Sequence, residues 1–296
     1  MEENFPRDLF APLLENDPVA GIFLLVARLF TTTIFVYYIV VELFQPARIQ
    51  AEMAKHNIPG ELVYFALAIQ IAGCLFVALG YKTRFAALLL AVFCIVATLL
   101  FNWGSIVNGS KDFGIAGGLF FMFAYGPGPI SVDALLGRAN AAASGEGSYH
   151  GVFSSVLENK SVMGPLLLAG RSFAAVIFLI FGQNKVIHNA QMQAYMVKHN
   201  AHVPTVLIFP ALVLQLVGGL MLMFGYKTRY AAISLAGFCL IATLLFHFEF
   251  NVTAEVIQFM KDFSLAGSLM FMFANGPGPL SADARQGRSN LNTERV

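Results

Sequence analysis

Charged residues are scarce in this 296-residue chain. Asp, Glu, Lys and Arg make up only 12% of the sequence, against about a quarter in an average soluble domain, whereas hydrophobic residues make up 57%. The mean hydropathy is +0.70. These values predict an integral membrane protein that lies in a lipid bilayer. The formal net charge of +1 gives no support to nucleic-acid binding.

Cysteine is scarce as well, and its spacing points to no redox centre. The three cysteines all lie inside apolar runs: Cys74, Cys94 and Cys239. No two of them have Cys-x-x-Cys spacing, so neither dithiol chemistry nor a disulfide framework is expected. The N-terminus lacks the basic start and short apolar core of a cleavable signal peptide, so we expect it to be retained.

The chain contains the same pattern twice. The stretch at 93–101 returns at 238–246, and Gly-Tyr-Lys-Thr-Arg at 80–84 returns unchanged at 225–229. Both pairs are 145 residues apart (238 − 93 and 225 − 80), so one duplication explains both. We define residues 1–143 as the first repeat and residues 144–296 as the second, with the division in an Ala-, Ser- and Gly-rich linker.

Each repeat contains four apolar stretches of about the 20 residues that a membrane-spanning helix needs. They are 19–44, 62–79, 85–103 and 106–125 in the first repeat, and 165–187, 206–224, 230–248 and 252–275 in the second. We therefore predict an all-α integral membrane fold of eight transmembrane helices, arranged as two tandem four-helix bundles. Because four crossings return the chain to its starting side, the bundles should be parallel repeats about an axis along the membrane normal.

Lys and Arg are unevenly divided between the two predicted membrane faces. The face with both termini, the linker and the Gly-Tyr-Lys-Thr-Arg turns carries ten of these residues, and the other face carries at most six. The positive-inside rule then puts both termini in the cytoplasm. We expect the protein in a bacterial cytoplasmic (inner) membrane.

The order of motifs resembles a known family. The second repeat runs from Arg171 through the motifs Phe-Leu-Ile-Phe-Gly-Gln-Asn-Lys, Gly-Tyr-Lys-Thr-Arg, Ala-Thr-Leu-Leu-Phe-His-Phe and Phe-Met-Lys-Asp-Phe-Ser-Leu-Ala-Gly to a Gly-Pro-Gly ending. This order is similar to that of the DoxX family of four-helix membrane proteins, and the likeness spans nearly the whole of each repeat. The chain therefore resembles a tandem, fused DoxX pair.

The resemblance implies a role in membrane redox chemistry. It suggests an accessory membrane subunit of a quinone-linked oxidoreductase rather than a stand-alone enzyme, with quinone as the candidate cofactor and a membrane or peripheral redox protein as partner. Two alternatives are a small-solute transporter, suggested by parallel repeats with buried charges, and a scaffold or assembly factor without chemistry. The sequence identifies no catalytic residue and leaves open whether the fused pair forms oligomers.

Two arginines lie deep in the first predicted helix of each repeat, Arg28 and Arg171. A charge at such a depth costs about 2.5–3.5 kcal/mol unless it is paired or hydrated. We predict Asp112 and Asp262 as the partners, because a carboxylate accepts a bidentate guanidinium. Each aspartate follows a lysine, Lys111 or Lys261. The favoured interpretation is a structural ion pair within each repeat, and the alternative is ligand binding or proton handling.

Gln70 and Gln215 form a second matched pair, at positions where DoxX proteins often have glutamate. Because small residues beside them allow close helix approach, we favour an interhelical hydrogen bond over recognition of a quinone carbonyl.

The repeats also differ at two notable polar positions. The first repeat has Glu42 where the second has Lys185, and it has Asn102 where the second has His247. His247 is therefore the residue most suited to a task of the second repeat alone. A metal site formed by His188, His199, His202, His247 and Glu249 is the weaker alternative, and we expect neither a metal nor a haem.

Overall fold

The computed structural model describes residues 10–102, 106–144, 157, 159–199 and 202–286. The helices of the first repeat are α1 (Ala11–Glu15), α2 (Asp17–Phe44), α3 (Pro46–Lys55), α4 (Leu62–Leu79), α5 (Thr83–Phe101), α6 (Ile106–Tyr125) and α7 (Val132–Ser144). Those of the second are α9 (Lys160–Ile187), α10 (Asn189–His199), the 3-10 turn η1 (Thr205–Leu207), α11 (Ile208–Phe224), α12 (Thr228–Phe246) and α13 (Thr253–Asn275). The all-α class predicted from the sequence is confirmed.

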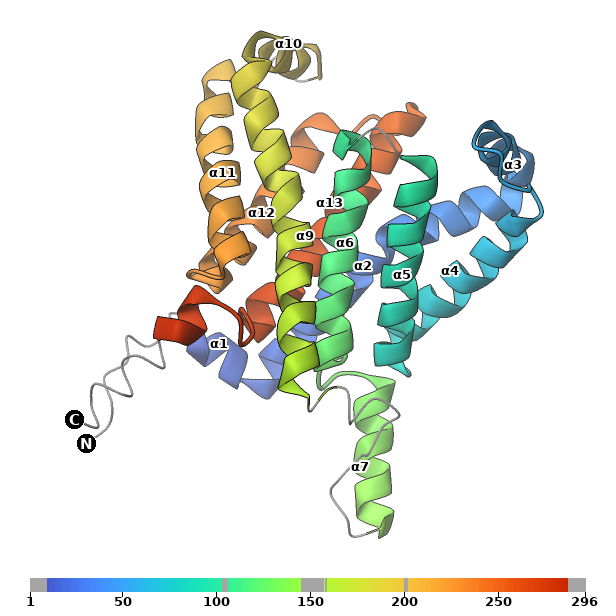
Figure 1. The fold of residues 1–296 in the computed structure, drawn as a ribbon, viewed down its shortest axis with the longest axis vertical. Coiled ribbons are helices and arrows are strands. Elements are labelled where there is room, and N and C mark those ends of the chain that lie inside the picture. The colour runs from blue at the N-terminus through green and yellow to red at the C-terminus, as the bar shows by residue number, and fades with distance from the viewer. Residues whose placement is uncertain (1–9, 103–105, 145–156, 158, 200–201, 287–296) are drawn as a thin grey trace.

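Seven helices of the described chain are long and apolar enough to cross a membrane. They are α2, α4, α5, α9, α11 with its preceding turn, α12 and α13. Helix α6 coincides with the remaining predicted span and lies among the long helices, next to α9 (Figure 1). Helix α6 carries Lys111 and Asp112, and these two charged residues lower its mean hydropathy. Its composition therefore identifies it less clearly as a membrane span.

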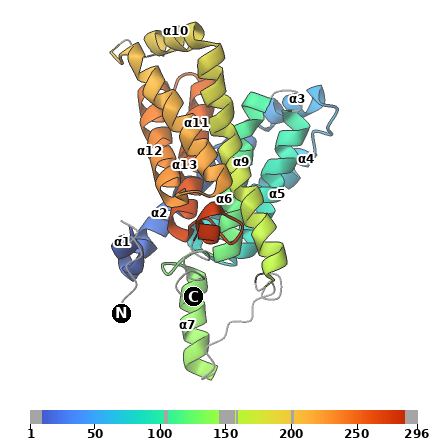
Figure 2. The same cartoon turned by 60° about the vertical axis from the view of Figure 1, so that its left-hand side comes forward.

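The short helices mark the two ends of the molecule. Helix α10 lies across one end of the second-repeat helices, and α3 lies at the same end of the first repeat, as both views show (Figures 1 and 2). Helix α7 projects from the opposite end. We name these ends the α10 end and the α7 end.

The two repeats do not form separate four-helix bundles, which corrects the predicted arrangement. Helix α2 packs most extensively on α13 of the other repeat, and α9 packs most extensively on α6, whereas α2 and α6 barely touch. Helices α6 and α13 also pack on each other in the centre. Each bundle is therefore completed by a helix from the other repeat.

Glycines allow this exchange of helices. A Cβ on Gly267 of α13 would lie 2.5 Å from the Ala27 carbonyl oxygen of α2, and a Cβ on Gly117 of α6 would collide with the Gly170 carbonyl of α9. The backbones thus approach each other as small residues permit in membrane helix pairs. Where α6 meets α13, Gly118 faces Ser268, whose side chain occupies the space that a Cβ on Gly118 would need.

A hydrogen-bonded contact secures the α2–α13 crossing. The hydroxyl groups of Thr33 and Ser264 lie 2.9 Å apart, and the Ile34 N–H donates to the Ser264 hydroxyl at 3.0 Å. Thr33 also donates to the Met260 carbonyl oxygen at 3.0 Å. These bonds join the repeats in an environment that offers no competing water.

The α7 end is built in the same way in both repeats. Helix α4 ends at Gly80, in a left-handed conformation with φ of 71°, and Lys82 adopts φ of 43° before α5 begins. The Asp133 carboxylate accepts from the Lys82 N–H at 2.7 Å and from the Thr83 N–H at 3.0 Å, which caps α5. Asp283 caps α12 through Lys227 and Thr228 in the second repeat.

Candidate ligand-binding site in the second repeat

A cavity of about 580 Å³ lies inside the second repeat, bounded by α9, α11, α12 and α13. Met192, Tyr195 and Met196 of α10 line it at one end, and Lys111 of α6 reaches it from the first repeat. Most of its wall is aliphatic or aromatic, including Ile177, Phe178, Phe181, Leu214, Phe238 and Leu265. An apolar cavity with few polar groups is the usual form of a small-molecule site.

Two lysines bring positive charge to this cavity. The Lys185 ammonium donates to Gln215 Oε1 at 2.7 Å, and Lys111 Nζ lies 2.6 Å from Asp262 Oδ1. Both ammonium nitrogens lie 5.9 Å from the centroid of the Phe181 ring, a cation–π distance. Lys185 therefore offers hydrogen-bond donors beside an aromatic face.

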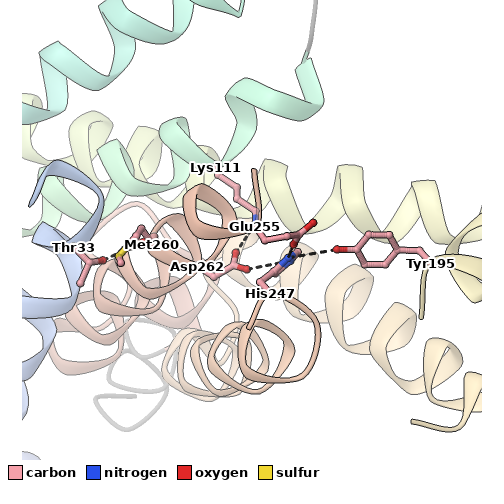
Figure 3. A network of polar contacts seen from close by, with 7 residues as sticks. All are labelled: Thr33, Lys111, Tyr195, His247, Glu255, Met260 and Asp262. Carbon is pink, nitrogen blue, oxygen red and sulfur yellow. Dashed lines mark hydrogen bonds and ion pairs between the residues drawn. The ribbon is translucent and has the colours of Figure 1, made fainter. Parts of the chain in front are cut away.

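His247 lies at the centre of a polar network on the cavity wall (Figure 3). Its Nδ1 lies 2.5 Å from Glu255 Oε2 and 3.4 Å from the Tyr195 hydroxyl, and its Nε2 lies 3.8 Å from Asp262 Oδ2. The imidazole thus stands between two carboxylates. Since α12 ends immediately before His247, the ring is placed at the helix terminus rather than within a packed turn.

Tyr195 and His199 extend the network toward the α10 end. Their rings are in tilted contact with centroids 4.1 Å apart, and His199 Nδ1 lies 3.6 Å from the half-exposed Glu249 carboxylate. Burial, assisted by the negative charge of Glu255, raises the pKa of Tyr195 well above its usual value. Its hydroxyl therefore remains a neutral hydrogen-bonding group over the physiological range.

The predicted pairing of the buried arginines is wrong. Arg28 and Arg171 are 1% and 0% exposed, but their guanidinium groups donate to the carbonyl oxygens of Ile130 and Leu280 at the α7 end. Helical side chains point back toward the helix N-terminus, so an arginine in this position reaches the α7 end rather than the aspartates. The arginines tie α2 and α9 to the segments that follow α6 and α13.

The aspartates instead pair with lysines of the other repeat. Lys111 lies 2.6 Å from Asp262, and Lys261 lies 2.8 Å from Asp112. All four side chains are at most 17% exposed. The Lys-Asp motif, which recurs in both repeats, therefore joins them through two reciprocal ion pairs.

Gln70 and Gln215 each form the expected interhelical hydrogen bond. Gln70 Nε2 donates to Glu42 Oε1 at 2.7 Å, and Gln215 Oε1 accepts from Lys185 Nζ at the same distance. The amide thus presents its donor to a carboxylate in one repeat and its acceptor to an ammonium in the other. A role of these glutamines in ligand recognition stays a prediction.

Tyr195 and Glu255 were not predicted from the sequence. The alignment of the repeats contained a signal for Tyr195, because the first repeat has Glu52 at the equivalent position. The offset of 143 residues (195 − 52) is the one that also relates His199 to His56.

In the described part of the chain, no group of three or more His, Cys, Asp or Glu side chains is arranged to hold a metal ion. His247 instead faces the carboxylates with its two ring nitrogens on opposite sides.

The fold and the matched motifs define an integral membrane protein of the DoxX family. The DoxX family model matches residues 23–103 and 166–248, which make up more than half of the chain, so the chain belongs to this family. Each matched segment covers the first three long helices of a repeat and ends before α6 or α13.

Two relatives come from Escherichia coli K12. Inner membrane protein YqjF is 32% identical over 117 residues, which cover 40% of this chain and 88% of that protein. Inner membrane protein YphA is 28% identical over 125 residues, which cover 40% of this chain and 89% of that protein. No solved structure matches the chain. Like these relatives, the protein is an integral inner membrane protein.

Proposed function

We propose that this DoxX protein is an accessory membrane subunit of a quinone-linked redox complex and that the cavity of the second repeat binds a quinone. The cavity itself carries the proposal. Its volume of about 580 Å³ lies within the range of about 300–1,000 Å³ found for small-molecule sites. The partner of the protein would be a membrane or peripheral redox protein that exchanges electrons with the bound quinone.

The residues of the cavity match the chemistry of a quinone ring. A quinone has a flat apolar ring with carbonyl oxygens that accept hydrogen bonds, and Phe178, Phe181 and Phe238 supply apolar surface for such a ring. Lys185 and His247 supply polar groups for its carbonyl oxygens. When bound, a quinone supplies two-electron, two-proton redox chemistry that no side chain of this site provides.

Binding of a short-chain quinone tests this function. We expect decylubiquinone to bind the purified protein in nanodiscs, and Lys185→Met to weaken binding at least about tenfold, which corresponds to about 1.4 kcal/mol. Glu42→Gln at the equivalent position of the first repeat is the matched control and should bind normally. The proposal is wrong if the wild-type protein binds no quinone and native-membrane preparations contain neither quinone nor a redox partner.

The membrane topology belongs to the same proposal. Helix α6 would be the eighth span, the two repeats would be parallel, and the α7 end would face the cytoplasm. The four basic residues of the two Gly-Tyr-Lys-Thr-Arg turns support this orientation, since all of them precede or begin α5 and α12 at the α7 end.

Single-cysteine labelling tests the orientation. In a background without the native cysteines, a membrane-impermeant maleimide should label Val197→Cys on intact spheroplasts, because Val197 of α10 is 53% exposed. It should label Leu136→Cys of α7, where leucine is 40% exposed, only after lysis. The reverse pattern would overturn the proposed orientation.

A further inference from the structure

We infer that Asp262, His247 and Glu255 form a proton-exchange path between the second-repeat cavity and the surface at the α10 end. The inference rests on the proposed function only for the identity of the ligand, since a quinone is the group that would take or release the proton. The path itself is made of side chains of this chain and can be tested without a ligand.

The inner end of the path lies on the cavity wall. Asp262 and His247 both line the cavity, and the 3.8 Å between Nε2 and Oδ2 needs only a small side-chain adjustment to become a hydrogen bond. The other Asp262 oxygen is held by Lys111 at 2.6 Å. Asp262 is therefore fixed in place with one oxygen directed at the imidazole.

The outer end of the path is carried by α13. Glu255 lies in the first turn of α13 and contacts His247 Nδ1 at 2.5 Å, while its own side chain is 13% exposed. The Tyr195 hydroxyl lies 3.4 Å from the same nitrogen, while the Tyr195 ring is in tilted contact with the His199 ring, and His199 faces the exposed Glu249 carboxylate. Because the contact between Tyr195 and His199 is between rings and not a hydrogen bond, Glu255 is the outer end of the proton path.

The proton transfers balance at each atom. When the Nε2–H bond of His247 breaks, its proton forms an O–H bond at Asp262 Oδ2. At the same time Nδ1 takes the proton of a protonated Glu255, whose carboxyl group then regains one from the surface. The imidazole ends neutral, as it began, with its proton on the other nitrogen. Histidine suits this role because both of its nitrogens exchange protons near neutral pH.

Charged and titratable groups reach this network from every surrounding helix except α11, which contributes only the amide of Gln215. They are Lys111 of α6, Lys185 of α9, Tyr195 and His199 of α10, His247 after α12, and Glu255 and Asp262 of α13. Lys111 forms an ion pair with Asp262, and Lys185 is hydrogen-bonded to Gln215, so both lysines already have a polar partner beside the network.

The first repeat has only part of this path. It keeps the Lys-Asp motif, but Asn102 stands where the second repeat has His247, and Glu52 stands where it has Tyr195. An amide does not titrate in this range, so it does not relay protons as an imidazole does. The proton path and the cavity thus occur together in the second repeat.

The first test uses the ligand-free, full-length protein in nanodiscs. Deuterium exchange at the imidazole C2 hydrogen, followed by mass spectrometry, proceeds through the protonated ring and so reports whether a histidine takes up a proton and is reached by solvent. We expect His247 to exchange within about tenfold of the exposed His188, and Glu255→Gln to slow it while Glu255→Asp restores it. Full protection of His247, or no effect of Glu255→Gln, would overturn the path whether or not quinone binds.

The second test follows proton uptake when bound decylubiquinone is reduced by a viologen radical. His247→Gly should slow uptake about 100-fold, the lower range for a lost proton-transfer group, and imidazole added to the solution should restore it. Asn102→Gly in the first repeat is the matched control and should have no effect. Normal uptake in His247→Gly, or slow uptake that imidazole does not restore, contradicts the inference. If the wild-type protein binds no quinone, the proposed function is contradicted instead.

Discussion

Lys111 and Asp262 belong to different repeats, and their charged atoms lie 2.6 Å apart. The reciprocal pair, Lys261 and Asp112, has a separation of 2.8 Å. A motif of two adjacent residues, duplicated with the rest of the sequence, thus provides a symmetric clamp at the centre of the molecule. The cavity of the second repeat depends on the clamp because Lys111 and Asp262 are part of its wall.

Breaking one of these ion pairs should destabilise the protein strongly. Lys111→Met leaves the Asp262 charge buried without its partner, which costs about 3–5 kcal/mol in comparable cases. We expect a marked fall in the thermal midpoint in detergent, measured by the loss of the monodisperse species in size-exclusion chromatography.

The control for this prediction is an ion pair on the solvent-exposed surface of the protein. Lys55 pairs with Glu52 on the surface, where their side chains are 68% and 51% exposed, so Lys55→Met should cost less than about 1 kcal/mol. The reversed pair Lys111→Asp with Asp262→Lys should recover part of the lost stability. Equal effects of Lys111→Met and Lys55→Met would show that the buried pair has no structural role.

Gly80 should not tolerate a side chain. Its φ of 71° costs an alanine about 1–2 kcal/mol, and a Cβ would also overlap the guanidinium group of Arg28. We expect Gly80→Ala to lower the thermal midpoint, and Gly225→Ala to do the same, because Arg171 occupies the equivalent position. Gly237→Ala, where a Cβ meets no atom within 4 Å, should be neutral or stabilising.

The exchange of helices between repeats predicts a specific disulfide. With the native cysteines replaced, Thr33→Cys and Ser264→Cys should cross-link on mild oxidation, because the two hydroxyl oxygens lie 2.9 Å apart. A cross-link between Thr33→Cys and Ser110→Cys, the position in the first repeat that corresponds to Met260, should not form. Efficient formation of the second cross-link would mean that α2 packs on the α6 of its own repeat. Mobility on non-reducing gels after cleavage within the linker distinguishes the two.

The raised pKa of Tyr195 predicts a loss of stability in alkali. An unfolded tyrosine ionises near pH 10, whereas burial and Glu255 keep the folded Tyr195 protonated above that pH. Its contribution is therefore complete below about pH 10 and declines as the pH rises, because only the unfolded form then gains from losing its proton. Tyr195→Phe should lose less thermal stability than the wild-type protein between about pH 8 and pH 11. Tyr64→Phe, at a position 58% exposed, should behave as the wild type.

Periodicity and duplication were sufficient to predict the long helices, because a bilayer requires long apolar helices with internal hydrogen bonds. They were insufficient to predict which helices meet. The offset between repeats relates equivalent positions but does not say whether α2 packs on α6 or on the equivalent helix, α13. Arg28 shows the same limit, since its buried position was predicted while its side-chain direction and its partner, Ile130, depend on the three-dimensional arrangement.

The candidate site was predicted in part. His247 stood out because the first repeat has Asn102, and Lys185 stood out because the first repeat has Glu42. Tyr195 contributes to the same network from α10, a helix outside the long apolar spans predicted from the sequence. Its place beside His247 follows from the way α10 folds over the end of the cavity, which no periodic pattern specifies.

Gly118 and Ser268 meet where the central helices α6 and α13 cross. They occupy equivalent positions in the two repeats, so two identical repeats would have the same residue at both positions. Two glycines there would leave a gap, and two serines would collide, since the Ser268 side chain already occupies the space of a Cβ on Gly118. Joining both halves in one chain fixes which half supplies which residue. Covalent fusion therefore allows the two halves of the interface to differ, with glycine on α6 and serine on α13, and it allows the second repeat alone to carry His247 where the first repeat has Asn102.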